Sequence, residues 1–98
     1  MKFDEFWNRL SKEFSSSRTI HTLKQGKEFK VRISGDNAIV IPGTQYRRYI
    51  AKSEFHKIWN IALGITNAYR PSNYSKSTYN ASYILATMKH ILNYEEIE

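Results

Sequence analysis

The chain of 98 residues carries a net charge of +6, contains no cysteine and is 41% hydrophobic. These values predict one folded domain with a single modest core, and they exclude a disordered chain, a disulfide framework and a thiolate metal site. The absence of cysteine, of a signal-peptide pattern and of a long apolar run leads us to expect a cytoplasmic protein that does not bind a membrane.

The first predicted element is a helix over about residues 2–15, within an N-terminal helical segment of residues 1–16. Large apolar side chains recur there at helical spacing, at Phe3, Phe6, Trp7, Leu10 and Phe14. A run of serines at 15–17 then favours a turn over a continued helix. We interpret the apolar stripe as core packing, with an exposed dimerisation face as the alternative.

A three-stranded antiparallel meander is predicted over residues 28–50. Its strands are EFKVRIS, AIVI and YRRYI, and glycine-containing turns separate them. Apolar and charged residues alternate in the first strand, which places Lys30 and Arg32 together on a polar face. Arg47 and Arg48 would point to opposite faces of a regular strand, so one of them needs a partner or a place at the sheet edge.

The remaining part, residues 53–92, is predicted to be helical. One helix follows Ser53, a short helical turn begins at Pro71, and a last helix is capped by Thr78 or Asn80. The chain is therefore predicted to be α+β, with an N-terminal helix, a three-stranded meander and two to three C-terminal helices on one face of the sheet.

The alternative arrangement is a winged-helix-like one, in which a basic hairpin stands beside a pair of helices. The connector between the two long helices is long for the tight turn of a helix-turn-helix unit. A short helix in the middle of the connector would shorten this gap. An acidic tail over residues 93–98 completes the single domain, residues 1–98.

Charge is distributed unevenly along the chain. Residues 14–94 hold 12 Lys and Arg against three acids, a balance of +9, and the other acids lie in the first helix and the tail. From Phe55 to Tyr94 there is no acid. A basic body with acidic ends favours a polyanionic partner, of which nucleic acid is the commonest; a basic domain without such a partner is the alternative.

The segment YRPSNYSKSTYNASYILATMKHIL, residues 69–92, combines cations, hydroxyl and amide donors, and the start of a helix. These are the groups that bind phosphate in protein–nucleic acid complexes, and no acid in the segment opposes them. The alternative is that these side chains only cap the helix and cover the edge of the core. The predicted nucleic-acid-binding residues are Lys30, Arg32, Arg47, Arg48, Arg70, Ser72, Lys76, Thr78, Tyr79, Asn80 and Ser82. Tyr79, Asn80 and Ser82 are the candidates for contacts with bases or sugars.

Catalytic and metal-binding patterns are not found. His21, His56 and His90 fall in separate predicted elements, without a pair at the spacing of metal ligands. The sequence contains no nucleophile elbow, phosphate-binding loop or dinucleotide fingerprint. We therefore expect a protein that is not an enzyme and has no catalytic residue, metal site or cofactor.

The chain resembles a small DNA-associated domain of bacterial restriction, defence and DNA-processing proteins. The resemblance covers roughly residues 20–92 and runs through three segments, TLKQGKEFKV, YIAKSEFHKIW and NASYILATMKHIL. The matching positions are Thr22, Leu23, Gly26, Lys27, Phe29, Val31, Ile50, Phe55, Asn80, Ser82, Tyr83, Ile84, Ala86 and Met88. The resemblance implies association with DNA rather than catalysis, in a protein of bacterial, phage or mobile-element origin.

The expected function is therefore non-catalytic binding of nucleic acid, with duplex DNA preferred over RNA. One alternative is a protein-interaction module, such as a phage-encoded inhibitor or a subunit of a larger complex, that uses the first helix or the tyrosine-rich loop. A homodimer is also compatible with the sequence. Another alternative is RNA binding by stacking of bases on Tyr46, Tyr74 and Tyr79.

Overall fold

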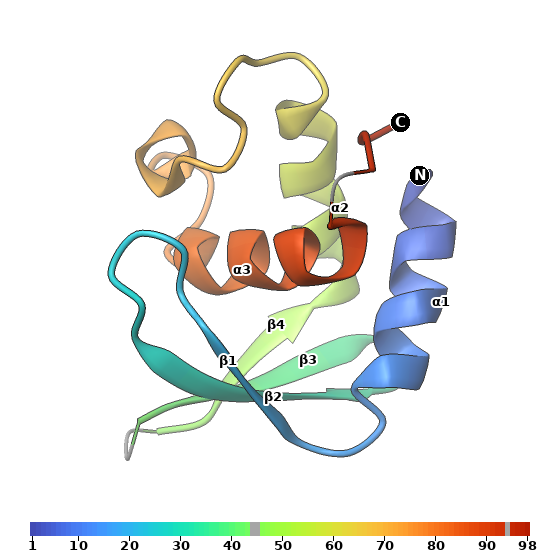
Figure 1. The fold of residues 1–98 in the computed structure, drawn as a ribbon, viewed down its shortest axis with the longest axis vertical. Coiled ribbons are helices and arrows are strands. Elements are labelled where there is room, and N and C mark those ends of the chain that lie inside the picture. Colours follow the sequence, from blue (N-terminus) through green and yellow to red (C-terminus); the bar gives the residue numbers. More distant parts are fainter. Residues whose placement is uncertain (44–45, 94) are drawn as a thin grey trace.

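The computed structural model describes residues 1–43, 46–93 and 95–98 and has an α+β fold (Figure 1). The described elements are α1 (Phe3–Glu13), β1 (Arg18–His21), β2 (Glu28–Ser34), β3 (Asn37–Pro42), β4 (Arg48–Ala51), α2 (Lys52–Ala62), the 3-10 helix η1 (Pro71–Tyr74) and α3 (Ala81–Leu92). The predicted class, the N-terminal helix and the C-terminal helices are confirmed. Predicted helix boundaries differ from the observed ones by one or two residues.

The sheet has four strands in the order β1-β2-β3-β4, and every neighbouring pair is antiparallel. The predicted count of three strands is wrong, because β1 pairs with β2 along its whole length, from Arg18 opposite Val31 to His21 opposite Glu28. A strand of four residues with one buried side chain, Ile20, has too little alternation to stand out in the sequence. Its pairing partner defines it.

All three α-helices lie on one face of the sheet, as Figure 1 shows. Every second side chain of β2 points to this face. The register places these side chains opposite inward side chains of β3, for example Val31 opposite Val40 and Ile33 opposite Ala38. No helix among the described residues covers the other face, so the sheet has one buried side and one open side. Lys30 and Arg32 are on the open side, as predicted.

The core lies between the helices and the sheet and is rich in aromatic rings. The apolar stripe of α1 is buried in it, which confirms the interpretation of this stripe as core packing and not as an exposed apolar face. Phe6 and Trp59 of α2 have ring centroids 5.0 Å apart, and Trp7 meets Phe55 edge-on at 5.3 Å. Among the described residues, no helix is long and apolar enough to cross a membrane.

The β2–β3 hairpin is the centre of the sheet. Its inward side chains belong to the core, so it is not a wing that projects beside a pair of helices. Residues 63–80 join α2 to α3, and η1 occupies the middle of this connector, where a short helix was predicted. The arrangement is therefore a one-sided helix-on-sheet fold rather than the winged-helix alternative.

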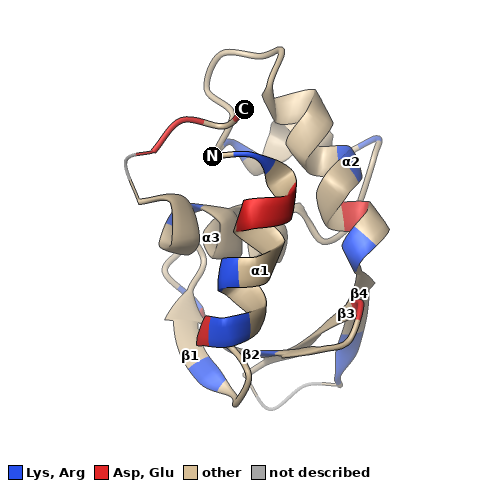
Figure 2. Ribbon diagram, turned by 90° about the vertical axis from the view of Figure 1, so that its right-hand side faces the viewer, with Lys and Arg blue, Asp and Glu red and all other residues tan. Residues whose placement is uncertain are grey.

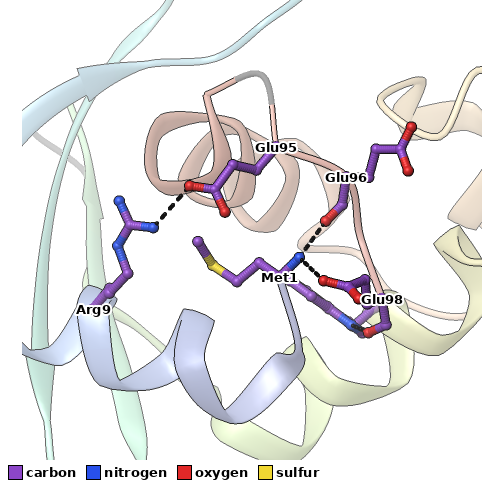
Figure 3. A network of polar contacts seen from close by, with 6 residues as sticks. Met1, Arg9, Glu95, Glu96 and Glu98 are labelled. Carbon is purple, nitrogen blue, oxygen red and sulfur yellow. Dashed lines mark hydrogen bonds and ion pairs between the residues drawn. The ribbon is translucent and has the colours of Figure 1, made fainter.

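The first and last residues of the chain are joined by hydrogen bonds (Figure 3). The amino group of Met1 donates to the Glu96 carbonyl oxygen and lies 2.6 Å from a carboxylate oxygen of Glu98. The Trp59 indole N–H donates to the Glu98 carbonyl oxygen, and Arg9 pairs with Glu95 at 3.2 Å. The hydrogen bond and charge of the Met1 amino group hold the pKa of Glu98 below its usual value. The acidic tail therefore packs against the start of α1 and against α2.

Candidate nucleic-acid interface

A cleft of about 600 Å³ separates the β1–β2 loop from the start of α3. Two cations and one acid line it, together with polar and apolar side chains. Its lining residues, which we call the basic cleft, are Thr22, Leu23, Lys24, Gln25, Lys27, Glu28, Pro42, Gly43, Pro71, Ser82 and Tyr83. In Figure 1 the β1–β2 loop and the start of α3, which border the cleft, lie on the side of the molecule away from α1.

The β1–β2 loop is held in a defined shape by its own hydrogen bonds. The backbone N–H of Thr22 donates to the Lys27 carbonyl, and the N–H of Lys27 donates to the Thr22 hydroxyl oxygen, each at about 3 Å. Gly26 has a φ of +64°, in the left-handed region that residues with a Cβ rarely adopt. This shape places Lys24 and Lys27 at the mouth of the cleft, both exposed to solvent.

Tyr83, in the first turn of α3, contributes a ring to the cleft. It packs edge-on against Phe29 with 5.0 Å between centroids, and the guanidinium carbon of Arg48 lies 5.3 Å from its centroid. Arg48 also donates a hydrogen bond to the side-chain oxygen of Asn80 at 3.2 Å. Arg48 lies on the helix-covered side of β4, at the sheet edge. It is therefore the strand arginine that the sequence predicted to need a partner.

A second hollow of about 480 Å³ adjoins the basic cleft and is lined by Arg70 and Ser72. The two hollows share Leu23, Lys24 and Pro71. The fold therefore brings the predicted residues Arg70 and Ser72 next to the predicted residue Ser82, although ten or more positions separate them along the chain.

Tyr74, in the same 3-10 helix as Ser72, packs in the core. Its ring is fully buried, and its hydroxyl donates to the Ala68 carbonyl oxygen at 2.6 Å. Burial and, to a smaller extent, the neighbouring Tyr69 raise the pKa of Tyr74 above its usual value. Burial likewise raises the pKa of Tyr69. Tyr74 is therefore a structural residue and not a platform for a base, which corrects one of the three stacking positions expected for RNA.

The immediate start of α3 differs from the expectation of a phosphate site without an opposing charge. Glu54, in the first turn of α2, accepts hydrogen bonds from the Thr78 hydroxyl and from the side-chain amide of Asn80, the latter at 3.3 Å. Thr78 is buried, and its oxygen in turn accepts the backbone N–H of Asn80. The structure thus gives the Thr78 hydroxyl a partner within the protein, a carboxylate from another helix, and the predicted contact of Thr78 with phosphate stays a prediction.

The other predicted residues lie around these hollows or away from them. Lys30 and Arg32 point to the open side of the sheet, away from α3. Arg47 is exposed just before β4, and Lys76 is exposed after η1. Tyr79 is 96% exposed. The predicted set therefore divides between the hollows, their surroundings and the open sheet face, instead of forming one patch.

The acidic side chains gather largely at the opposite end of the molecule. Figure 2 shows red acidic positions at both ends of α1 and in the tail, on the same side of the fold. Glu13 pairs there with Arg18 at 2.9 Å and with His90 at 2.8 Å. Burial alone would raise the pKa of Glu13, but its contacts with His90 and Arg18 outweigh burial and lower it.

The cations of the two hollows have no such partners. None of the ion pairs found within the described residues involves Lys24, Lys27 or Arg70. The acids near the chain ends pair with basic groups close to them: Glu13 with Arg18, Glu95 with Arg9, and Glu98 with the Met1 amino group. Among the described residues, the cations around the cleft have no carboxylate partner. The result is a molecule with a basic end.

Sequence reasoning did not include Lys24, Gln25 or Lys27 among the binding residues. The available signal was the TLKQGK segment, which is part of the resemblance to a DNA-associated domain. A turn glycine flanked by lysines, between two strands, would have indicated a cationic hairpin loop.

Comparison of the chain with known protein families, with curated proteins and with solved structures finds no significant match. Within residues 1–43, 46–93 and 95–98, no group of three or more His, Asp or Glu side chains is placed to hold a metal ion. The proposal for the function therefore rests on the basic cleft, the adjoining hollow and their cations Lys24, Lys27 and Arg70.

Proposed function

We propose that the protein binds nucleic acid without catalysing a reaction, and that duplex DNA is its preferred ligand. The observation that carries this proposal is the gathering of Lys24, Lys27 and Arg70 around two adjoining hollows, without a carboxylate partner. Lysine and arginine side chains that lack ion pairs are available to neutralise phosphates, and release of counterions then drives binding.

The surroundings of these cations supply the other groups that hold a phosphate backbone. Ser72 and Ser82 add hydroxyls, Gln25 adds an amide, and α3 begins beside the cleft with its positive dipole end. The cations line the hollows and are themselves exposed, which suits contact with the outside of a duplex. Arg47 and Lys76, which line neither hollow, are also exposed and add to the positive charge of the surface.

The sequence resemblance to a DNA-associated domain supports the same proposal. We further propose that the protein acts in the cytoplasm of a bacterium, as part of a phage, a mobile element or a defence system. Of the two contact surfaces expected for the protein-interaction alternative, the α1 stripe is buried. In the tyrosine-rich loop Tyr74 is buried, whereas Tyr79 is 96% exposed.

The test is fluorescence anisotropy of labelled duplex DNA at several salt concentrations, with the wild type and two double variants. Lys24→Ala/Lys27→Ala removes two cations from the basic cleft. Lys2→Ala/Lys12→Ala removes two exposed cations from α1 and its N-terminal flank, so that both variants have the same net charge. The plot of log affinity against log salt has a negative slope. We expect this slope to be less steep by about 2 in the cleft variant, since each phosphate contact contributes about 0.9 to its magnitude.

The control variant should keep the wild-type slope. Equal losses in the two variants would mean that net charge, and not the cleft, governs binding. Absence of wild-type binding to duplex DNA at low salt would contradict the proposal.

A further inference from the structure

We infer that the open face of the sheet is a second binding surface, and that its ligand is single-stranded nucleic acid. This inference goes beyond the proposed function, because it uses other residues and another ligand. It starts from the one-sided packing of the fold, in which α1, α2 and α3 all cover the same face (Figure 1).

The centre of the open face is a row of three side chains on three neighbouring strands. The register places Arg32 of β2 opposite Ile39 of β3, and Ile39 opposite Tyr49 of β4. Tyr49 is 64% exposed, whereas Ile39 is only 9% exposed although no helix among the described residues covers this face. The row thus places a guanidinium and an exposed aromatic ring on either side of an isoleucine.

A second row lies two residues along the strands, at a distance of about 7 Å. It consists of Thr19 on β1, Lys30 on β2 and Ile41 on β3. The open face therefore carries a cation in each row, beside an apolar residue of the central strand β3. Strand β3 therefore has apolar residues on both of its sides: Ala38 and Val40 toward the core, and Ile39 and Ile41 on the open face.

Charge on this face is complementary to a polyanion. Among the described residues of the strands that point to it, Glu28 is the only carboxylate, and it lies next to His21 at the outer end of β1. A second copy of the chain stacked face to face would bring the Lys30 and Arg32 side chains of both copies into a low-dielectric contact, which disfavours self-association.

The mixture of an aromatic ring, aliphatic side chains and cations selects an unpaired strand over a duplex. Bases of a duplex are stacked inside it and cannot reach Tyr49, whereas unpaired bases stack on exposed aromatic rings while cations follow the phosphates. Within this row, Tyr49 is the exposed aromatic ring, and Arg32, on the other side of Ile39, is half-buried.

The test compares the Tyr49→Ala variant with a Leu63→Ala control, in anisotropy titrations of labelled oligothymidylate and of duplex DNA. Both side chains are exposed, and Leu63 follows α2 and is not on the sheet. We expect Tyr49→Ala to weaken binding of the single strand about fivefold or more and to leave binding of the duplex unchanged. Tyr49→Phe, which keeps the ring, should bind the single strand as the wild type does.

Arg32→Gln provides a second, independent variant if loss of the Tyr49 ring disturbs β4. It should lower the salt slope of single-strand binding by about 0.7. Equal binding of oligothymidylate by the Tyr49→Ala and Leu63→Ala variants, or a wild-type salt slope in Arg32→Gln, would overturn the inference. So would a stable dimer in light scattering that Tyr49→Ala dissociates. The proposed function is judged separately by the Lys24→Ala/Lys27→Ala variant on duplex DNA.

Discussion

The hydroxyl of Thr78 donates a hydrogen bond to the carboxylate of Glu54 and thereby joins the segment before α3 to the first turn of α2. The same carboxylate accepts from Asn80, whose side-chain oxygen accepts from Arg48. This chain of contacts fixes the start of α3 next to the basic cleft. It also places one negative charge where the sequence indicated none, because Glu54 lies just outside the acid-free stretch.

Replacement of Glu54 by glutamine should separate these two effects. Glu54→Gln keeps an oxygen for the Thr78 hydroxyl but removes the charge, so we expect tighter duplex binding by a factor of about two to five, the effect of one surface charge. The free energy of unfolding should fall by about 1 kcal/mol, since a charge-assisted hydrogen bond becomes a neutral one. Anisotropy and urea unfolding measure the two quantities. Glu5→Gln, on the acidic side of the fold, should change neither, and weaker DNA binding by Glu54→Gln would contradict the account.

Substitution of Gly26 should show that the shape of the β1–β2 loop matters. A Cβ at Gly26 meets no atom within 4 Å, so Gly26→Ala is opposed only by its φ of +64°. We expect a loss of about 1 kcal/mol in the free energy of unfolding and weaker duplex binding as Lys24 and Lys27 move. Gly64→Ala is the matched control, because the nearest atom to its Cβ is 3.8 Å away and its φ is not positive. Equal stability of the two variants would be inconsistent with a strained turn.

Removal of the Tyr74 hydroxyl should destabilise the segment from Ala68 to Tyr74, which carries Arg70. Tyr74→Phe loses the hydrogen bond to Ala68 at 2.6 Å and leaves that carbonyl without its partner. The expected cost is about 1 kcal/mol in thermal or urea unfolding. The exposed Tyr79 provides the comparison, since Tyr79→Phe should have no measurable effect. A Tyr74→Phe variant as stable as the wild type would mean that water replaces the bond.

Acid should remove the contribution of Glu13 to stability. The pKa of Glu13 is lower in the folded protein than its ordinary value of 4.5. Its contribution is therefore complete above pH 4.5 and is lost as the pH falls through the lowered folded pKa. We expect wild type and Glu13→Gln to differ by less than about 1 kcal/mol in unfolding free energy at pH 6, because this carboxylate is partly exposed.

The difference between the two proteins should shrink as the pH falls below 4.5 and Glu13 becomes protonated. Glu98, whose pKa is also lowered, is present in both proteins and cancels in this comparison. A difference that stays constant from pH 6 to pH 3 would show that Glu13 contributes through packing instead of charge.

Much of the fold follows from local patterns in the sequence. The α1 stripe, the alternation around Val31 and the Pro71 turn each specify an element by short-range periodicity or by a single restricted residue. Strand β1 does not, because its identity depends on pairing with β2. Its one buried residue, Ile20, gives no alternation to count.

The site is harder to predict than the fold for the same physical reason. Arg70 and Ser82 were selected because they lie in one acid-free segment, and the structure does bring them near each other. Lys24 and Lys27 come from a loop about 45 positions away, which only the packing of the sheet under α3 brings to the same cleft. Glu54 also comes close to Thr78 only through the packing of the fold. The composition of residues 69–92 therefore could not reveal this contact.

The central claim, that duplex DNA binds at the basic cleft, is tested most directly by two-dimensional NMR of ¹⁵N-labelled protein titrated with a short duplex. The account predicts that backbone amide signals shift in residues 22–28, at Arg70 and Ser72, and at Ser82 and Tyr83. Amides of α1 and of the tail should stay unchanged. Shifts confined to α1 and the tail, or an unchanged spectrum at low salt, would contradict it.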